Sequence, residues 1–245
     1  PFPVTHGYLN KPTVVNNVET FVAGARIAVF GGEWFRSKGT DQSHGTKLLS
    51  ISGDCQHPGV YEYPFGVTIK QILQDCGAVD TQAVQIAGAA GTTLPLAEAE
   101  RSIAFEDIST AGSFMVFNNN RNLLETVQNF ADFFVHESCG FCTPCRVGSS
   151  LLRDLVEKLV NGHATRYDVE EMQQIGTLMR RTSHCGLGST APGPVLDLLE
   201  RFPQLVEKQL AHSNYEPAFD LDAALQEARD ITGRDDAGAH IGSDS

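Results

Sequence analysis

The sequence predicts an α+β fold in which a small unit of strands and one helix precedes a bundle of helices. The hydrophobic period changes from strand-like alternation to helical spacing after residue 118, and the strand patterns stop at the same place. Four of the six cysteines also lie in two short stretches of the helical part. We therefore expect the end of a preceding domain with a linker at residues 1–45, a sheet unit at 46–118, a helical unit at 119–215 and a tail at 216–245.

The composition is that of an ordinary globular protein with an acidic balance. Of 245 residues, 41% are hydrophobic and 20% are charged, and 18 Lys and Arg against 30 Asp and Glu give a net charge of −12. This charge, with no run of basic residues, argues against binding to nucleic acid or to an anionic membrane surface. No apolar run is long enough to span a membrane and no signal peptide opens the chain, so we expect a cytoplasmic, reducing location. Because the chain begins with Pro1 and not with Met, it is either processed or a piece of a longer protein.

The first 45 residues combine a polar asparagine pair with one helical pattern. Asn16 and Asn17 fit either a turn that caps a helix or a contact to a polar small molecule, and the sequence favours capping. The apolar residues from Phe21 to Val29 have helical spacing, and the glycines at 31 and 32 are a common helix stop.

Residues 47–118 predict a β-grasp, or ubiquitin-like, unit, because the order strand, strand, helix, strand, strand is typical of that fold. Thr68 is the expected N-cap of the helix. Cys55 and Cys76 are interpreted as a turn residue and a core thiol. No constellation of polar or aromatic residues indicates a ligand of this unit. The expected strands, together with a small hairpin around Leu94, lie at residues 48–51, 60–63, 83–87 and 113–117.

Helical spacing in the second half predicts a four-helix bundle and a short terminal helix. Asp168 and Glu171 resemble a capping arrangement for the third helix, and Pro203 is expected to bend or break the fourth. From Gly233 the chain is rich in Asp, Gly and Ser and has the composition of a mobile tail. The expected helices lie near residues 123–137, 144–160, 168–182, 195–210 and 223–231.

The cysteine spacing indicates a metal centre. Cys139, Cys142 and Cys145 are separated by two-residue gaps, and Cys185 is a distant fourth thiol on a glycine-rich loop. Three close thiolates with one remote partner are typical of a 4Fe–4S cluster, whereas zinc ligands usually come as two separated pairs. A structural zinc site with four thiolates stays the alternative.

One of these cysteines is expected at the start of a helix. Thr143 and Pro144 fit the N-cap and the first helical position, so Cys145 falls in the first turn, where free N–H groups favour anionic sulfur. Arg146 either raises the potential of a cluster by stabilising its more negative reduced state or is a solvated charge at the helix start. His184 is interpreted as an ordinary histidine.

These motifs resemble a family of NADH dehydrogenase subunits that carry a flavin and an iron–sulfur cluster. The family includes a subunit of respiratory complex I and related subunits of soluble NAD-dependent formate dehydrogenases and NAD-reducing hydrogenases. Its order after the flavin domain is a soluble-ligand-binding β-grasp (SLBB) unit and then a helical 4Fe–4S domain, an order that covers residues 1–215 here. The resemblance rests on residues 12–21, 52–54, 58–62 and 137–148.

The resemblance implies an oxidoreductase that relays single electrons between FMN and downstream iron–sulfur clusters through one 4Fe–4S cluster on the four cysteines. It also implies that Asn16 and Asn17 belong to the last flavin-contacting segment, while the main FMN- and NAD-binding domain is missing from this chain. The implied partners are that flavin-binding N-terminal portion, a small 2Fe–2S thioredoxin-like subunit and a catalytic large subunit. The fragment alone is expected to be inactive.

The last part of the sequence indicates which branch of the family the chain resembles. Residues 183–188 and 219–236 resemble the soluble enzymes more than complex I. We favour the beta subunit of formate dehydrogenase over the diaphorase subunit of a hydrogenase. A hypothesis from another class is a scaffold, in which the β-grasp unit docks partner subunits and the metal only stabilises the bundle.

Overall fold

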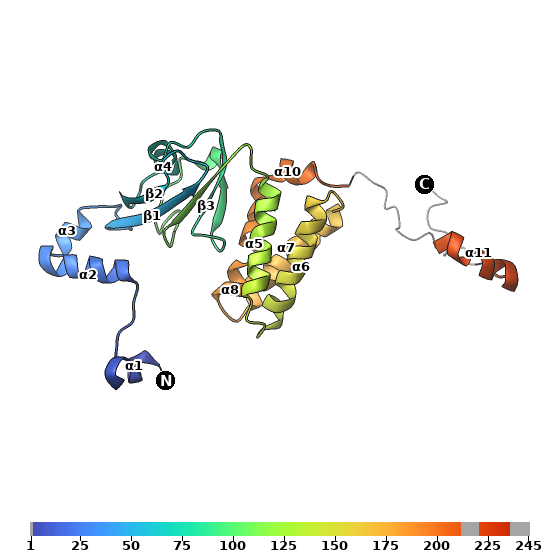
Figure 1. Cartoon of the computed structure of the whole chain (residues 1–245), viewed down its shortest axis with the longest axis horizontal. Helices are drawn as coiled ribbons and strands as arrows, with labels where there is room; N and C mark the ends of the chain where they lie inside the picture. Colours follow the sequence, from blue (N-terminus) through green and yellow to red (C-terminus); the bar gives the residue numbers. More distant parts are fainter. Residues whose placement is uncertain (1, 212–220, 236–245) are drawn as a thin grey trace. The chain divides into compact units, whose positions relative to one another are not determined.

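The computed structural model describes residues 2–211 and 221–235. The chain divides into a first unit, Pro1–Leu210, and a second unit, Ala211–Ser245. The first unit has a mixed α+β fold with one five-stranded sheet (Figure 1). In the second unit the described residues include the expected terminal helix, α11 (Leu221–Thr232). Most of the predicted tail lies outside the described residues.

The N-terminal segment is helical and buries none of its side chains. Its principal helix begins where the asparagine pair predicts: Asn17 Oδ1 accepts a hydrogen bond from Glu19 N at 2.8 Å, and Asn16 Oδ1 accepts one from Asn17 N at 2.7 Å. The helix ends at Gly31, whose φ of +83° favours glycine. The elements are α1 (Pro3–His6), η1 (Tyr8–Asn10), α2 (Val18–Phe30) and α3 (Gly32–Arg36).

The sheet has the strand order β2-β1-β5-β3-β4. Its central pair, β1 and β5, is parallel, and the other neighbouring pairs are antiparallel. Thr68 caps the intervening helix as expected, since its hydroxyl accepts a hydrogen bond from Gln71 N at 3.2 Å. The elements are β1 (Thr46–Gly53), β2 (Gly59–Pro64), α4 (Ile69–Asp75), β3 (Thr81–Ile86), β4 (Thr92–Pro95), η2 (Leu96–Glu98) and β5 (Ser113–Asn118).

Strand β5 contributes side chains to two hydrophobic cores. Phe114 and Val116 are fully buried in a core that the sheet shares with α4. Met115 and Phe117 point to the opposite face, as the two-residue period of a strand requires, and they pack with the core of the helices. The sheet is therefore covered on one face by α4 and on the other by the helical part.

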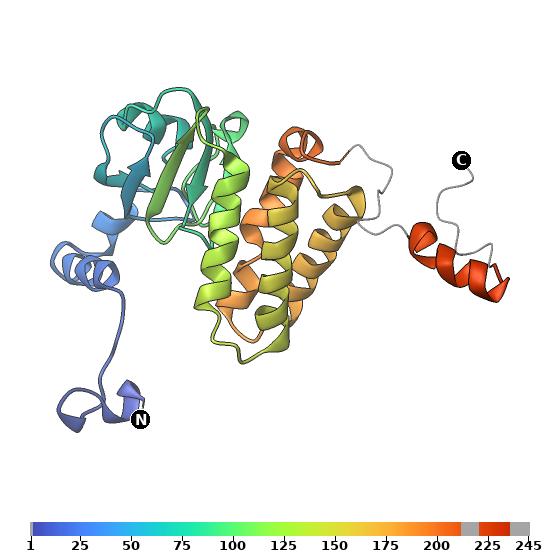
Figure 2. The ribbon, with the colours of Figure 1, turned by 45° about the vertical axis from the view of Figure 1, so that its right-hand side comes forward.

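The helical part packs α5, α6, α7 and α9 around that second core (Figures 1 and 2). The expected break at Pro203 is present, because α9 ends at Arg201 and a new short helix begins at Pro203. No helix in the described part of the chain is long and apolar enough to cross a membrane. The elements are α5 (Leu123–Glu137), α6 (Thr143–Val160), α7 (Arg166–Thr182), α8 (Gly186–Thr190), α9 (Gly193–Arg201) and α10 (Pro203–Glu207).

Two predicted helix starts were wrong by a few residues. Helix α6 begins one residue early, at Thr143, so Cys142 occupies the N-cap position without making a side-chain cap. Helix α7 is capped by Thr165 and Asp168, whose side chains and backbone N–H groups bond reciprocally, and not by Asp168 with Glu171. A capping box pairs a capping residue with an acidic or amide residue three positions later. The sequence offers two such pairs, Thr165 with Asp168 and Asp168 with Glu171.

Polar contacts attach the sheet to the helical part. The buried carboxylate of Asp197, on α9, accepts a hydrogen bond from Thr93 N on β4 at 2.8 Å. Arg201, one turn further along α9, forms an ion pair with Glu98 of η2. Since α9 follows directly after the segment that carries Cys185, these contacts fix the position of that segment relative to the sheet.

Asp54, the residue that follows β1, anchors the connection between the sheet and α5. Its carboxylate binds the Arg121 guanidinium at 2.9 Å and accepts a hydrogen bond from Asn118 N at 3.0 Å. The Arg121 hydrogen bond lowers the pKa of Asp54, and burial opposes that shift without cancelling it. Asp54 therefore contacts both ends of the linker between β5 and α5, at Asn118 and at Arg121.

The lowered pKa predicts an acid-sensitive contribution to stability. A carboxyl group whose pKa is lower in the folded state stabilises the protein above its unfolded pKa of about 3.9, and the contribution is lost as pH falls through the folded value. We expect Asp54→Asn to lower the free energy of unfolding by about 1 kcal/mol at pH 7 and to flatten its pH dependence below about pH 4. Urea titrations at several pH values measure both. Arg121→Gln is the matched control, and a loss in the double variant equal to the sum of the single losses would contradict the pairing.

Candidate metal centre

The segments that carry the four cysteines of the spacing motif lie at one end of the helical part (Figures 1 and 2). The connection between α5 and α6 carries Cys139 and Cys142, and Cys145 follows in α6. Cys185 immediately precedes α8, which lies at the same end of the helices (Figures 1 and 2). All four thiols are free of disulfides, Cys145 is buried, and Cys139 and Cys185 are exposed.

Cys145 occupies the first turn of α6, as the sequence predicts. It is the third helical residue, after Thr143 and Pro144. The first N–H groups of a helix have no partner within the helix, and the positive end of the helix dipole stabilises a thiolate there. The Ser138 hydroxyl lies 3.4 Å from Cys145 Sγ. Cys145 is therefore a buried thiol at a helix start, with a hydroxyl group beside its sulfur.

The loop between the first two cysteines has a left-handed turn that an arginine fixes. Gly140 has a φ of +74°, a conformation that L side chains rarely adopt. Arg146 Nη1 donates a hydrogen bond to the Gly140 carbonyl at 2.5 Å. The guanidinium of the exposed Arg146 therefore closes the cysteine loop. This contact is compatible with both interpretations of Arg146, which stay predictions.

Cys142 connects the loop to the segment that carries the fourth thiol. The backbone N–H of His184, followed by that of Cys145, lowers the pKa of the Cys142 thiol. The rings of Phe141 and His184 also lie close, with centroids 5.4 Å apart. This ring contact brings the two cysteine stretches together, although they are distant in the sequence.

Cys185 lies in the short connection between α7 and α8, as expected, and is the N-cap residue of α8, whereas the glycines that follow it belong to this helix and not to the loop. Helix α8 begins at Gly186, and Gly188 within it packs against the other cysteine stretch. A Cβ atom at Gly188 would lie 2.6 Å from Ser183 Oγ and 2.8 Å from Cys145 Cβ, too close for any side chain. Glycine is therefore required at 188, because α8 approaches the Cys145 corner of the site closely.

The arrangement fits an iron–sulfur cluster. Four thiolates are the soft ligands that clusters use, and Cys145 has the electropositive helix start that an anionic group needs. A buried hydroxyl without a partner, that of Ser183, faces this corner. Within residues 2–211 and 221–235, no three His, Cys, Asp or Glu side chains stand close enough together to hold a single metal ion. The ligands of a cluster surround a larger body and need not converge on one point.

The remaining two cysteines lie in the sheet unit, as predicted. Cys55 follows β1 in a turn, and Cys76 is fully buried at the end of α4. Burial, reinforced by the nearby Cys55, raises the pKa of the Cys76 thiol to about 11, so it stays protonated. Neither is part of the metal centre.

The structure does not bring Asn16 and Asn17 to the cysteines. Both side-chain oxygens accept backbone hydrogen bonds at the start of α2, which agrees with the capping interpretation. Sequence reasoning missed Ser138, Ser183 and Gly188. The only signal for the two serines was a hydroxyl within two residues of a ligand cysteine, and the contact of Gly188 depends on packing between distant segments.

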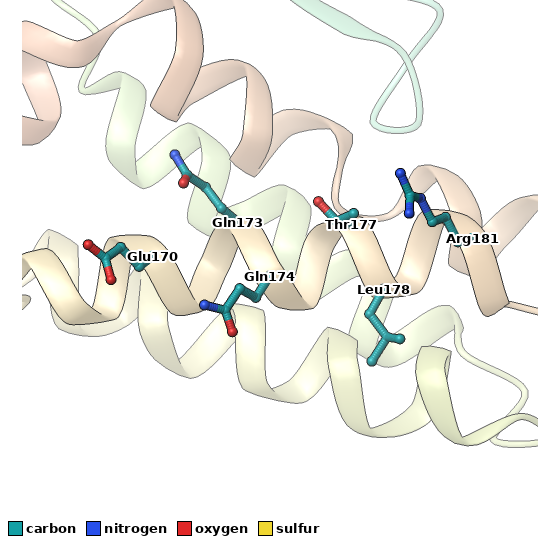
Figure 3. A pocket seen from close by; sticks show the side chains of 6 residues that line it. All are labelled: Glu170, Gln173, Gln174, Thr177, Leu178 and Arg181. Atoms are coloured by element: carbon teal, nitrogen blue, oxygen red, sulfur yellow. The ribbon is translucent and has the colours of Figure 1, made fainter.

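A surface depression of about 550 Å³ runs along α7. Figure 3 shows that its side chains spread from one length of that helix without converging on a point. It contains no cysteine, and it is not part of the metal centre. The lining residues are Glu170, Gln173, Gln174, Thr177, Leu178 and Arg181.

Comparison with known proteins agrees with the site. Residues 125–209 match the NADH-ubiquinone oxidoreductase-F iron-sulfur binding region. The chain is 50% identical over 228 residues to the alpha subunit of the NAD-reducing hydrogenase HoxS of Cupriavidus necator, a match that covers 92% of this chain and 38% of that protein. It is 33% identical over 222 residues to an NADH-quinone oxidoreductase subunit of Mycobacterium tuberculosis, covering 86% of this chain and 49% of that protein.

A solved structure of a hydrogenase is also similar to this chain. A crystal structure of an NAD+-reducing NiFe-hydrogenase in the H2-reduced state matches with a TM-score of 0.81 and 47% identity, over 99% of this chain and 43% of that chain. The chain thus spans less than half the length of the relatives named here. It carries the 4Fe–4S region, and it belongs to the family of NADH dehydrogenase subunits that includes this NADH-quinone oxidoreductase subunit and the alpha subunit of NAD-reducing hydrogenase.

Proposed function

We propose that this chain is the electron-transfer portion of an NAD(H)-linked oxidoreductase, which passes single electrons between FMN and further iron–sulfur clusters. The observation that carries the proposal is the meeting of the two cysteine stretches, through the ring contact of Phe141 with His184 and through the contact of Gly188 with Cys145. When bound, a 4Fe–4S cluster supplies one-electron transfer.

The roles of the chain's own residues follow from the geometry. The thiolates of Cys139, Cys142, Cys145 and Cys185 are the proposed ligands. The start of α6 stabilises negative charge at Cys145, and Arg146 holds the loop of residues 139–142 through its hydrogen bond to the Gly140 carbonyl. Burial of Cys145 excludes water from one corner of the site, while the exposed Cys139 and Cys185 leave another side accessible to a redox partner.

The hydrogenase branch is now better supported than the formate dehydrogenase branch that the sequence favoured. Identity to the HoxS alpha subunit is 50%, against 33% to the subunit of the quinone-linked enzyme, and the structural match is also to an NAD+-reducing hydrogenase. Residues 183–188 and 219–236 resemble the soluble enzymes, but they do not distinguish a formate dehydrogenase from a hydrogenase. We therefore propose that the complete enzyme is an NAD-reducing hydrogenase.

We interpret the sheet unit as the β-grasp (SLBB) unit and α5, α6, α7 and α9 as the four-helix bundle. The strand order β2-β1-β5-β3-β4 with a parallel central pair and one helix on one face supports the first interpretation. The shared core of the four helices supports the second. The domain limits at 45, 118 and 215 stay a proposal on the same grounds.

Residues 1–45 are proposed to complete a flavin-binding domain supplied by an N-terminal portion, which binds FMN and NAD. Their helices bury no side chain of their own, and large apolar residues such as Phe2, Val18 and Val29 are at least 70% exposed. An apolar surface of this extent is typical of a segment that packs against other protein. Asn16 and Asn17 lie in this segment, and their proposed contact to FMN rests on the family resemblance.

The other proposed partners also follow from the family. They are a small 2Fe–2S thioredoxin-like subunit and a catalytic large subunit, here that of a hydrogenase. The net charge of −12 supports the absence of nucleic acid among the partners. A cytoplasmic location and the absence of direct membrane contact stay predictions.

The decisive experiment is metal and sulfide analysis of the anaerobically purified chain. We expect about four irons and four sulfides per chain and a charge-transfer absorption that a reductant bleaches. One zinc without sulfide would identify the structural zinc site instead. An iron–sulfur cluster that accepts no electron in a redox titration of the assembled complex would support the scaffold hypothesis and refute the relay.

A further inference from the structure

Ser183 has a hydroxyl group whose hydrogen-bonding capacity is unused. In the described part of the chain, its Oγ is one of two buried side-chain polar atoms without a hydrogen-bond partner. Its backbone N–H is occupied, because it donates to Met179 O at 3.1 Å and so ends α7. A buried hydroxyl is almost always bonded in native proteins, so an unbonded one indicates a missing partner.

The unused hydroxyl lies at the metal centre. Ser183 stands two residues before Cys185 in the chain. The position of a Cβ at Gly188 lies 2.6 Å from Ser183 Oγ and 2.8 Å from Cys145 Cβ, so the hydroxyl and the Cys145 side chain are close neighbours. The missing partner of Ser183 is therefore to be sought at the Cys145 corner of the site.

A second hydroxyl reaches the same corner from the other cysteine stretch. Ser138 Oγ accepts a hydrogen bond from Gly140 N at 3.3 Å and lies 3.4 Å from Cys145 Sγ. A metal-binding cysteine is a thiolate and has no proton to donate. The proton between these two atoms then belongs to Ser138, which donates it to the Cys145 sulfur.

We propose that Ser138 and Ser183 donate hydrogen bonds to sulfur at the Cys145 corner of the bound cluster and thereby raise its reduction potential. Ser138 donates to Cys145 Sγ, and Ser183 donates to cluster sulfur next to it. Reduction adds a negative charge, so donors at this corner stabilise the reduced form more than the oxidised form. This inference rests on the proposed function, because it requires a cluster on the four cysteines.

The two serines reach this corner from different elements of the fold. Ser138 follows the end of α5 and Ser183 follows the end of α7, while Cys145 lies in the first turn of α6. Both hydroxyls therefore depend on the packing of three helices around a buried thiol. Water has little access to this corner, so each hydrogen bond affects the charge on sulfur more strongly than an exposed one.

The test compares Ser138→Ala, Ser183→Ala and the double variant with the wild-type chain. Each protein is prepared anaerobically, its iron content is measured, and its potential is determined by redox titration followed by EPR. We expect full iron content and, at the wild-type midpoint, about a tenfold lower ratio of reduced to oxidised cluster for each single variant, which corresponds to about 59 mV for a one-electron couple. The double variant is expected to shift further.

Controls separate the hydrogen bond from a general effect of removing a hydroxyl. Ser189, on α8, donates to the Gly186 carbonyl at 3.1 Å, so Ser189→Ala is expected to leave the potential unchanged. Ser138→Thr and Ser183→Thr keep the donor and are expected to keep the potential near that of the wild type. Pulsed EPR after exchange into deuterated water is expected to lose one exchangeable deuteron near the cluster in each alanine variant.

The outcomes distinguish this inference from the proposed function. A wild-type chain without a reducible cluster overturns the proposed function. A reducible cluster whose midpoint and exchangeable deuterons are unchanged in both alanine variants overturns only the inference. If an alanine variant retains no iron, the threonine variant decides, because restored iron with a wild-type midpoint supports the donor and restored iron with a lowered midpoint contradicts it.

Discussion

Replacing Cys145 by alanine is expected to abolish cluster binding, with iron and sulfide falling from about four each per chain to near zero. Cys145 is the buried corner of the site, in the first turn of α6 and in contact with both Ser138 and the α8 segment. No neighbouring group is available to replace it, since the other described cysteines outside the motif lie in the sheet unit. Iron and sulfide analysis with visible absorption measures the loss.

Cys55→Ala is the matched control for this experiment. Cys55 is a partly exposed cysteine in a turn of the sheet unit, and its removal is expected to leave the iron content unchanged. Cys185→Ala removes an exposed proposed ligand. Like Cys145→Ala, it is expected to lower the iron content per chain, and it is also expected to shorten the lifetime of the cluster in air. Full and stable iron content in Cys145→Ala would show that another residue holds the metal, and the ligand assignment would then be wrong.

Phe114→Ala is expected to give the largest loss of stability in the sheet unit, about 3–5 kcal/mol. Phe114 is fully buried on the central strand β5, against the core that includes α4. Its removal leaves a cavity that the surrounding strands cannot fill without distortion. Hydrogen–deuterium exchange of peptides from β5 and β1, read by mass spectrometry, measures the lowered opening free energy in that region.

The same variant tests the division of the chain. Phe114 belongs to the sheet core, whereas the four cysteines lie on or between the helices that form the other core, so we expect Phe114→Ala to retain its iron. Leu198 is fully buried on α9, and Leu198→Ala is the matched change in the helical core. It is expected to cost about 2–5 kcal/mol and to reduce the iron content. Equal loss of iron in both variants would show that the two cores unfold together and would argue against separate domains.

The local features of the fold could be predicted because they depend on neighbouring residues. The strands and helices follow from hydrophobic periods of two and 3.6 residues, and Thr68 and Asn17 cap their helices through contacts two or three residues away. The capping of α7 was predicted in the wrong register because two overlapping pairs satisfy the same pattern. Only the backbone conformation at Thr165 distinguishes between them.

The residue pattern alone indicates the kind of metal centre, whereas the packing of the helices sets which groups surround Cys145. The identity and spacing of Cys139, Cys142 and Cys145 indicate a soft-ligand centre without any structure, because a turn over these seven residues is enough to bring three thiols together. The approach of Gly188 and Ser183 to Cys145 joins segments about forty residues apart and depends on the packing of α6, α7 and α8. No local pattern encodes such a contact, since it arises from the sum of many side-chain contacts along three helices.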